Sequence, residues 1–124
     1  MPTAMVVDDS RTIRIILTKM LTDLGFEVCP AADGKEALQL VDREQGSFST
    51  IMVDWNMPEM NGLDLVKQMR SDPRLSAVPI VMITTETETR QVMAALQAGA
   101  NEYVMKPFSR EIIADKLRLL GVLE

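Results

Sequence analysis

The sequence predicts an α/β fold in which five parallel strands form one doubly wound sheet with helices on both faces. Five short apolar runs alternate with stretches of helical periodicity along the whole chain. Repeated strand–helix units of this spacing build parallel sheets, because each crossover helix returns the chain to the same end of the sheet. The 124 residues suit a single core, since 47% of them are hydrophobic.

The first strand–helix unit is expected to open with a strand over residues 4–7, which stops at Asp8. The helix that follows has apolar residues at the i, i+3, i+4 and i+7 spacing of one buried face. These apolar residues are Ile13, Ile16, Leu17, Met20, Leu21 and Leu24. Ser10 or Asp9 caps the start of this helix, and Gly25 suits its end.

The second unit begins with a strand over residues 27–32. Pro30 lies inside this strand and has no N–H group for a sheet hydrogen bond, so the strand belongs at an edge. Asp33 and Gly34 then turn the chain into a second helix. The apolar residues of that helix are Ala37, Leu38 and Val41.

The third unit carries a strand over residues 50–53, which ends at Asp54. A loop that contains Pro58 and Gly62 leads into the third helix. The apolar residues of this helix are Leu63, Leu65, Val66 and Met69. The segment 71–73 ends the helix, because the residue before a proline disfavours helical geometry.

The last two strands are expected over residues 80–83 and 102–105. A helix over 90–98 lies between them and stops at Gly99. Ser109 caps the final helix. The apolar residues of the final helix are Ile112, Ile113, Leu117 and Leu120.

Right-handed crossovers, with the Pro30 strand at an edge, favour the strand order 2-1-3-4-5 of flavodoxin-like (βα)5 folds. In such a sheet the ligand crevice lies at the carboxyl ends of the strands. The residues at four of these ends are Asp8 and Asp9, Asp54, Thr84 and Lys106. Three carboxylates, a hydroxyl and an ammonium therefore meet at one rim. This set suits a divalent cation beside an acidic nucleophile.

The composition narrows the function. Thirteen basic and eighteen acidic residues give a net charge of −5, so nothing in the charge favours nucleic-acid binding. No apolar run approaches the length of a membrane span, and no signal peptide is visible, so we expect neither a membrane partner nor secretion. The single cysteine, Cys29, excludes an internal disulfide and suits a reducing cytoplasm. The chain has no histidine, which excludes a histidine general base or metal ligand, and any phosphate that arrives from a histidine has to come from another protein.

Several motifs resemble the receiver domain of two-component response regulators, and the resemblance covers essentially the whole chain. These motifs are the segments 6–10, 54–58 and 106–108 together with Thr84. Within that family the likeness is strongest to the stand-alone chemotaxis regulators. The residues that carry this narrower likeness are the segment 54–58, the pair Gly99-Ala100 and Tyr103.

The resemblance implies that Asp54 accepts a phosphoryl group as an acyl phosphate. It implies a Mg²⁺ (or Mn²⁺) site in which Asp8, Asp9 and Asp54 supply carboxylates and Asn56 supplies its backbone carbonyl. Mg²⁺ prefers oxygen ligands and typically bridges one or two carboxylates to a phosphate, which agrees with this assignment. The dication also offsets the repulsion between the carboxylates and an anionic phosphoryl donor.

Five further residues have roles implied by the resemblance. Lys106 pairs with one phosphoryl oxygen, and Thr84 donates its hydroxyl to another. Movement of Thr84 makes room for Tyr103 to turn inward, which remodels the face made by the fourth helix, fifth strand and fifth helix. Thr85 and Glu86 modulate access to the site. Thr85 stands where chemotaxis regulators usually have alanine, and its β-branched side chain is expected to slow exchange with small donors.

The expected function is that of a single-domain response regulator spanning residues 1–124 with no output domain. It takes phosphate from a histidine kinase or phosphotransfer protein and signals to a downstream protein, with chemotaxis as the leading pathway. It is not expected to be an enzyme beyond its own phosphorylation and autodephosphorylation. A stand-alone relay regulator outside chemotaxis is the alternative pathway.

Three other classes of protein compete with this interpretation. A haloacid-dehalogenase-like phosphatase needs a second aspartate two residues after its nucleophile, where this chain has Asn56. A flavodoxin-like FMN carrier needs a phosphate loop after the first strand, where Asp8 and Asp9 repel phosphate. A degenerate receiver that acts only as an interaction module is disfavoured by the complete set of acids, hydroxyl and lysine.

Overall fold

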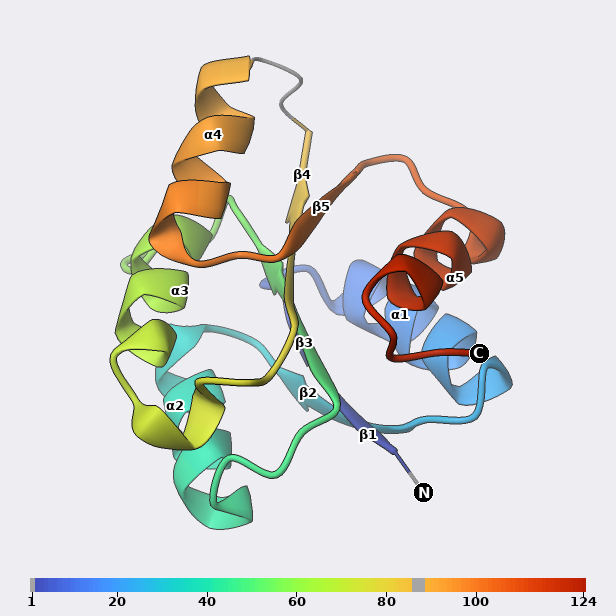
Figure 1. Cartoon of the computed structure of the whole chain (residues 1–124), viewed down its shortest axis with the longest axis horizontal. Coiled ribbons are helices and arrows are strands. Elements are labelled where there is room, and N and C mark those ends of the chain that lie inside the picture. Colours follow the sequence, from blue (N-terminus) through green and yellow to red (C-terminus); the bar gives the residue numbers. More distant parts are fainter. Residues whose placement is uncertain (1, 86–88) are drawn as a thin grey trace.

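The computed structural model describes residues 2–85 and 89–124. Five parallel strands form one sheet in the order β2-β1-β3-β4-β5, as predicted (Figure 1). The strands are β1 Thr3–Val7, β2 Glu27–Ala31, β3 Thr50–Asp54, β4 Ile80–Thr84 and β5 Glu102–Met105. The helices are α1 Arg11–Asp23, α2 Gly34–Glu44, α3 Gly62–Arg70, α4 Thr89–Ala98 and α5 Arg110–Leu119, and a short 3₁₀ helix, η1, covers Pro73–Leu75.

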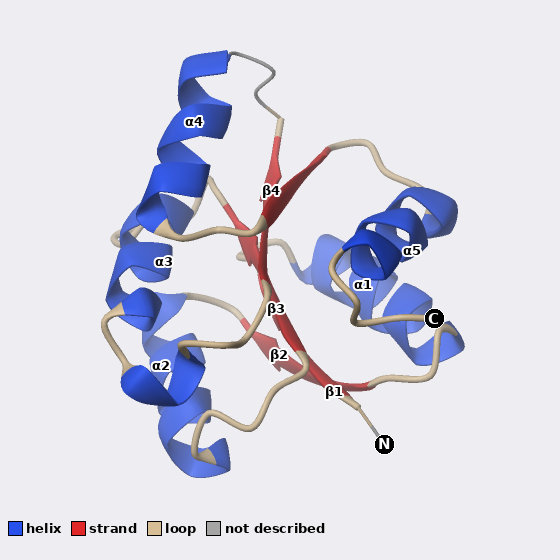
Figure 2. Ribbon diagram, in the orientation of Figure 1, coloured by secondary structure: helices blue, strands red, loops and turns tan. Residues whose placement is uncertain are grey.

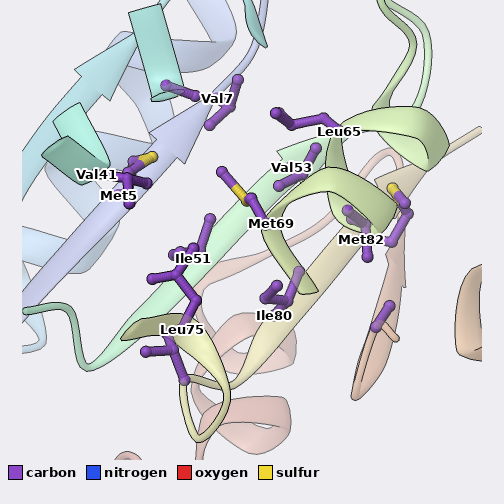
Figure 3. Packing of buried hydrophobic residues seen from close by; sticks show 14 of the residues in the cluster. Met5, Val7, Val41, Ile51, Val53, Leu65, Met69, Leu75, Ile80 and Met82 are labelled. Atoms are coloured by element: carbon purple, nitrogen blue, oxygen red, sulfur yellow. The ribbon is translucent and has the colours of Figure 1, made fainter. Parts of the chain in front are cut away.

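The helices form two layers, one on each face of the sheet, with α1 and α5 on one side and α2, α3 and α4 on the other (Figure 2). Each layer has its own apolar core. The α2–α3–α4 side buries Met5, Val41, Ile51, Leu65 and Met69, which interdigitate over the sheet in Figure 3. Because both faces of the central strands are covered, these strands are buried throughout, and their interior residues form apolar runs that do not alternate with polar residues.

The edge position of β2 follows from Pro30, which is exposed and lies opposite Val6 of β1 in the register. β2 ends at Ala31, one residue earlier than its expected end. β3 and β4 end at Asp54 and Thr84, as predicted, and include these two residues. Both side chains are therefore held by the sheet itself and do not lie in flexible loops.

Side-chain caps fix the starts of most helices. Ser10 accepts a hydrogen bond from the N–H of Ile13, as expected, and Ser109 does the same for α5. Gly25 and Gly99 follow α1 and α4 with positive φ angles of 100° and 117°, a conformation that favours glycine. These caps set where each helix begins and ends, and so how far each strand-end loop reaches.

Among the described residues, no helix is long and apolar enough to cross a membrane.

Candidate functional site

Asp54 is the last residue of β3, and only 3% of its side chain is exposed. Its Oδ1 accepts a hydrogen bond from Lys106 Nζ at 3.1 Å. Burial and the negative charge of Asp8 raise the pKa of the Asp54 carboxyl from 3.8 to about 6, although the bond from Lys106 opposes the shift. Among the described residues, Lys106 is the only cation that contacts this buried carboxylate.

Lys106 follows β5 and lies between two acids. Its Nζ is 3.1 Å from Asp54 Oδ1 and 3.5 Å from Asp8 Oδ2. Burial lowers the pKa of the ammonium, but the bond to Asp54 and the charges of Asp54 and Asp8 outweigh that effect, so the net pKa is raised. The backbone N–H of Lys106 donates to Thr84 O at 2.8 Å, and the Lys106–Pro107 peptide is cis.

Asp8 is completely buried at the end of β1. Its N–H donates to Ala31 O at 3.1 Å, and its Oδ1 accepts a bond from the N–H of Ser10 at 2.8 Å. Its Oδ2 accepts no hydrogen bond within the described part of the chain, and Lys106 Nζ is near it only as an ion-pair partner. A buried carboxylate oxygen without a hydrogen bond is costly unless a ligand completes it.

The carboxylates of Asp8, Asp9 and Asp54 each offer an oxygen, and these oxygens lie within 4.8 Å of one another. Asp8 and Asp54 are buried, whereas Asp9 is exposed at the rim. A set of oxygen ligands that opens to solvent on one side fits Mg²⁺ or Mn²⁺, and the unbonded Asp8 Oδ2 supports that fit. Asn56 lies exposed in the loop after β3, where the ligand role of its carbonyl stays a prediction.

Thr84 ends β4, and only 3% of it is exposed. It pairs in the register with Met105 of β5, one residue before Lys106. Thr85 is exposed and, with Lys106 and Pro107, lines a cavity of about 360 Å³. Glu86, the other expected modulator, lies outside the described residues.

Tyr103 lies half-buried on β5 and packs against the core of the α2–α3–α4 side. Lys116 of α5 places its Nζ 5.2 Å from the centroid of the Tyr103 ring. The same ammonium is 3.3 Å from Glu102 Oε1, which also accepts a bond from the N–H of Tyr103. The predicted switch residue therefore has a cation over its ring, a contact that the motifs did not reveal.

Two more residues that the motif analysis did not assign to the site contact its backbone. The N–H of Gly62 donates to Trp55 O at 2.8 Å, and a β-carbon at Gly62 would lie 2.2 Å from Asp54 O. Arg14 Nη1 donates to Asp8 O at 2.7 Å. Both act on main-chain carbonyls, which give no signal of their own in a sequence.

A parallel sheet of this order, with an acidic cluster at the ends of β1 and β3 and a lysine after β5, defines the receiver class of signalling domains. Residues 4–118 match the response regulator receiver domain family, and the chain belongs to that family.

Relatives and solved structures agree on the fold and the subfamily. Chemotaxis protein CheY1 of Helicobacter pylori is 47% identical over 117 residues, which are 94% of both chains. A Campylobacter jejuni CheY homolog is 44% identical over 91% of this chain and 87% of its own length. The crystal structure of Vibrio cholerae CheY4 has a TM-score of 0.91 at 37% identity and covers 97% of this chain and 98% of that one. The chain is thus CheY-like, and CheY is itself a standard example of its strand order.

Proposed function

We propose that this chain is a response regulator that accepts a phosphoryl group on Asp54 from a phosphohistidine of another protein. The observation that carries the proposal is the buried Asp54 carboxylate bonded to Lys106 within an acidic cluster. The donor is a histidine kinase or phosphotransfer protein, since this chain has no histidine. The 124 residues act as one receiver unit, and a reducing cytoplasm suits the unpaired Cys29.

Asp8, Asp9 and Asp54 would hold Mg²⁺ or Mn²⁺ together with the carbonyl of Asn56. When bound, the ion neutralises the carboxylates and stabilises the negative charge on the transferring phosphoryl group. Asp8 is prepared for this role because its N–H and Oδ1 are already bonded, which leaves Oδ2 for a ligand.

In the proposed reaction a phosphoryl group passes directly from the donor's phosphohistidine to a carboxylate oxygen of Asp54. The P–N bond to the donor imidazole breaks as the P–O bond to Asp54 forms, and the imidazole leaves with the bonding electron pair and takes up a proton from solvent. Lys106 Nζ, which contacts that carboxylate, is placed to pair with an oxygen of the incoming group. Thr84 ends the adjacent strand and would donate its hydroxyl to another phosphoryl oxygen. Asn56 stands where a phosphatase of the haloacid dehalogenase type needs an acid, so turnover of outside phosphate esters is not proposed.

The phosphoryl group acts as a switch by adding charge and acceptor oxygens beside Thr84. In the proposed response Thr84 moves toward the phosphoryl group, and Tyr103 turns into the space that Thr84 leaves. The face formed by α4, β5 and α5 then changes shape and binds or releases a target protein.

Chemotaxis is the proposed pathway, because the relatives at 41–47% identity are named as chemotaxis proteins. A stand-alone relay outside chemotaxis is the alternative pathway. Deletion of the gene separates them: a motile strain that loses directed swimming but keeps its growth and flagella supports chemotaxis. Unchanged swimming behaviour in the deletion strain contradicts it. Neither pathway requires nucleic acid as a partner.

Trp55, the chain's only tryptophan, follows the proposed acceptor directly and reports on it. We would titrate beryllofluoride, which stands in for the phosphoryl group, with and without Mg²⁺ while following Trp55 fluorescence. The native protein should give a Mg²⁺-dependent change, and Asp54→Asn should give none. A native protein without any response, or a variant with the same response, contradicts the proposed acceptor.

A further inference from the structure

The peptide group that joins Asp8 to Asp9 is held from outside the acidic cluster. Arg14, one turn into α1, donates from Nη1 to the oxygen of that peptide group, Asp8 O, at 2.7 Å. On the other side of the residue, the N–H of Asp8 donates to Ala31 O of β2. Because a peptide group is planar, fixing its oxygen fixes the plane from which both neighbouring residues project.

We infer that Arg14 is a positioning residue for the metal site, which orients Asp8 and Asp9 together through their shared peptide group. The inference rests on the proposed function, because it assumes that the acidic cluster binds Mg²⁺. Asp9 depends most on this support, since its side chain is exposed at the rim. Asp8 is also held by hydrogen bonds with Ser10 and Ala31. The bond from Arg14 differs from these because it acts on the peptide group that Asp8 and Asp9 share.

The positive charge of Arg14 disfavours Mg²⁺ binding, whereas its positioning of the two acids favours it. The direction in which Mg²⁺ affinity changes when Arg14 is replaced therefore tests the inference. A guanidinium near the cluster repels Mg²⁺, so a role through charge alone predicts tighter Mg²⁺ binding when Arg14 is neutralised. A positioning role predicts weaker binding, because the acids lose their fixed geometry. Partners that orient metal ligands without touching the metal typically change its affinity by about tenfold or more when they are lost.

The experiment is a Mg²⁺ titration followed by Trp55 fluorescence in the native protein, Arg14→Met, Arg14→Lys and Arg11→Met. Arg11 lies on the same helix, is exposed, and makes no ion pair or side-chain hydrogen bond within the described residues. Its substitution removes the same charge without removing the bond to Asp8. Titrations at low and high salt separate a screened charge effect from a short-range bond.

We expect Arg14→Met to bind Mg²⁺ about tenfold more weakly than the native protein at either salt concentration. Arg14→Lys, which keeps the charge but has a shorter reach, should lie between the two. Arg11→Met should bind as the native protein does, or slightly more tightly at low salt. An Arg14→Met affinity equal to or tighter than native overturns the inference.

Two further measurements keep the test decisive. If Arg14→Met gives no cooperative thermal unfolding, Arg14→Lys decides, and a native or tighter affinity in that variant overturns the inference. The amide NMR shift of Asp9 without Mg²⁺ should move in the Arg14 variants but not in Arg11→Met. That shift is independent of phosphorylation. If the native protein binds no Mg²⁺ at Asp54, the proposed function is refuted. The Asp9 amide shift still tests, independently, whether Arg14 orients Asp9.

Discussion

Lys106 Nζ lies 3.1 Å from Asp54 Oδ1, although the two residues are 52 positions apart in the sequence. β4 lies between their strands in the sheet, so the ion pair bridges β3 and β5 across the end of β4. Thr84 is the last residue of β4, the strand whose end the pair spans. In the proposed function, phosphorylation of Asp54 has to reorganise a contact that already links β3 to β5, the edge strand of the proposed target face.

Asp54→Asn should stabilise the metal-free protein at pH 7.5. The Asp54 carboxyl has a pKa of about 6 when folded, against 3.8 as its ordinary value. The folded state thus binds this proton more tightly, and native stability falls as pH rises from about 4 to 6, by on the order of 1–3 kcal/mol. Asparagine cannot ionise, so the variant avoids that loss.

Urea unfolding in EDTA at several pH values between 4 and 7.5 measures this effect. The difference between variant and native protein should be smallest near pH 4 and constant above pH 6.5. A variant that is less stable than native at pH 7.5, or a difference independent of pH, contradicts the raised pKa.

Gly62→Ala should damage both stability and the acceptor site. The added β-carbon would clash with Asp54 O and with the α-carbon of Trp55. Relief of this clash requires the backbone of β3 or α3 to shift. We expect a loss of about 2–4 kcal/mol in the free energy of unfolding, with weaker beryllofluoride binding. Gly34→Ala is the matched control, because Gly34 also begins a helix and its β-carbon meets the flexible Met60 sulfur at 2.9 Å. Equal losses in both variants would show that backbone proximity to Asp54 is unimportant.

Thr85→Ala should accelerate phosphorylation by small donors such as acetyl phosphate. Thr85 is exposed and lines a cavity together with Lys106. We expect its β-branched side chain to narrow the approach of a small donor to Asp54. A gain of about three- to tenfold corresponds to ~0.7–1.4 kcal/mol in the barrier. Thr85→Ser keeps the hydroxyl and removes only the methyl group, so it should also be faster than native. Stopped-flow Trp55 fluorescence gives the rates, and native rates that match or exceed those of Thr85→Ala refute the prediction.

Lys116→Met should favour the activated state if Tyr103 leaves the contact on activation. The ammonium over the ring contributes about 0.5–1 kcal/mol to the present conformation, as partly exposed cation–π contacts do. Its loss should tighten beryllofluoride binding about two- to fivefold. Lys19→Met, which removes an exposed lysine on α1, is the control. Unchanged or weaker binding in Lys116→Met shows that the contact does not restrain the switch.

The strand ends were the most predictable part of this molecule, because each apolar run stops abruptly at a polar residue. Pro30 correctly predicted that β2 lies at the edge of the sheet, because proline has no N–H to donate to a neighbouring strand. The predicted ends of β3 and β4 at Asp54 and Thr84 are confirmed, and both residues still take part in the pairing of the sheet.

The contacts of Arg14 and Gly62 were not predictable in the same way. Arg14 has the spacing of an ordinary polar residue on an amphipathic helix, and its partner is a main-chain oxygen. The sequence predicts Gly62 in a loop, but in the structure it is the first residue of α3 and lies against the backbone of Asp54. The sequence predicts only that the segment 71–73 ends a helix, and it does not predict the 3₁₀ turn Pro73–Leu75, because three residues are too few for a periodic pattern.

The order of the four charged residues along the chain has a consequence for synthesis. A polypeptide made from its N-terminus acquires Asp8, Asp9 and Asp54 long before the lysine that pairs with two of them. Until the fifth strand has left the ribosome, the three acids repel one another without that counter-charge. The newborn chain therefore completes this cluster only after residue 106 has been made, and a product terminated before that residue lacks the lysine that pairs with Asp8 and Asp54.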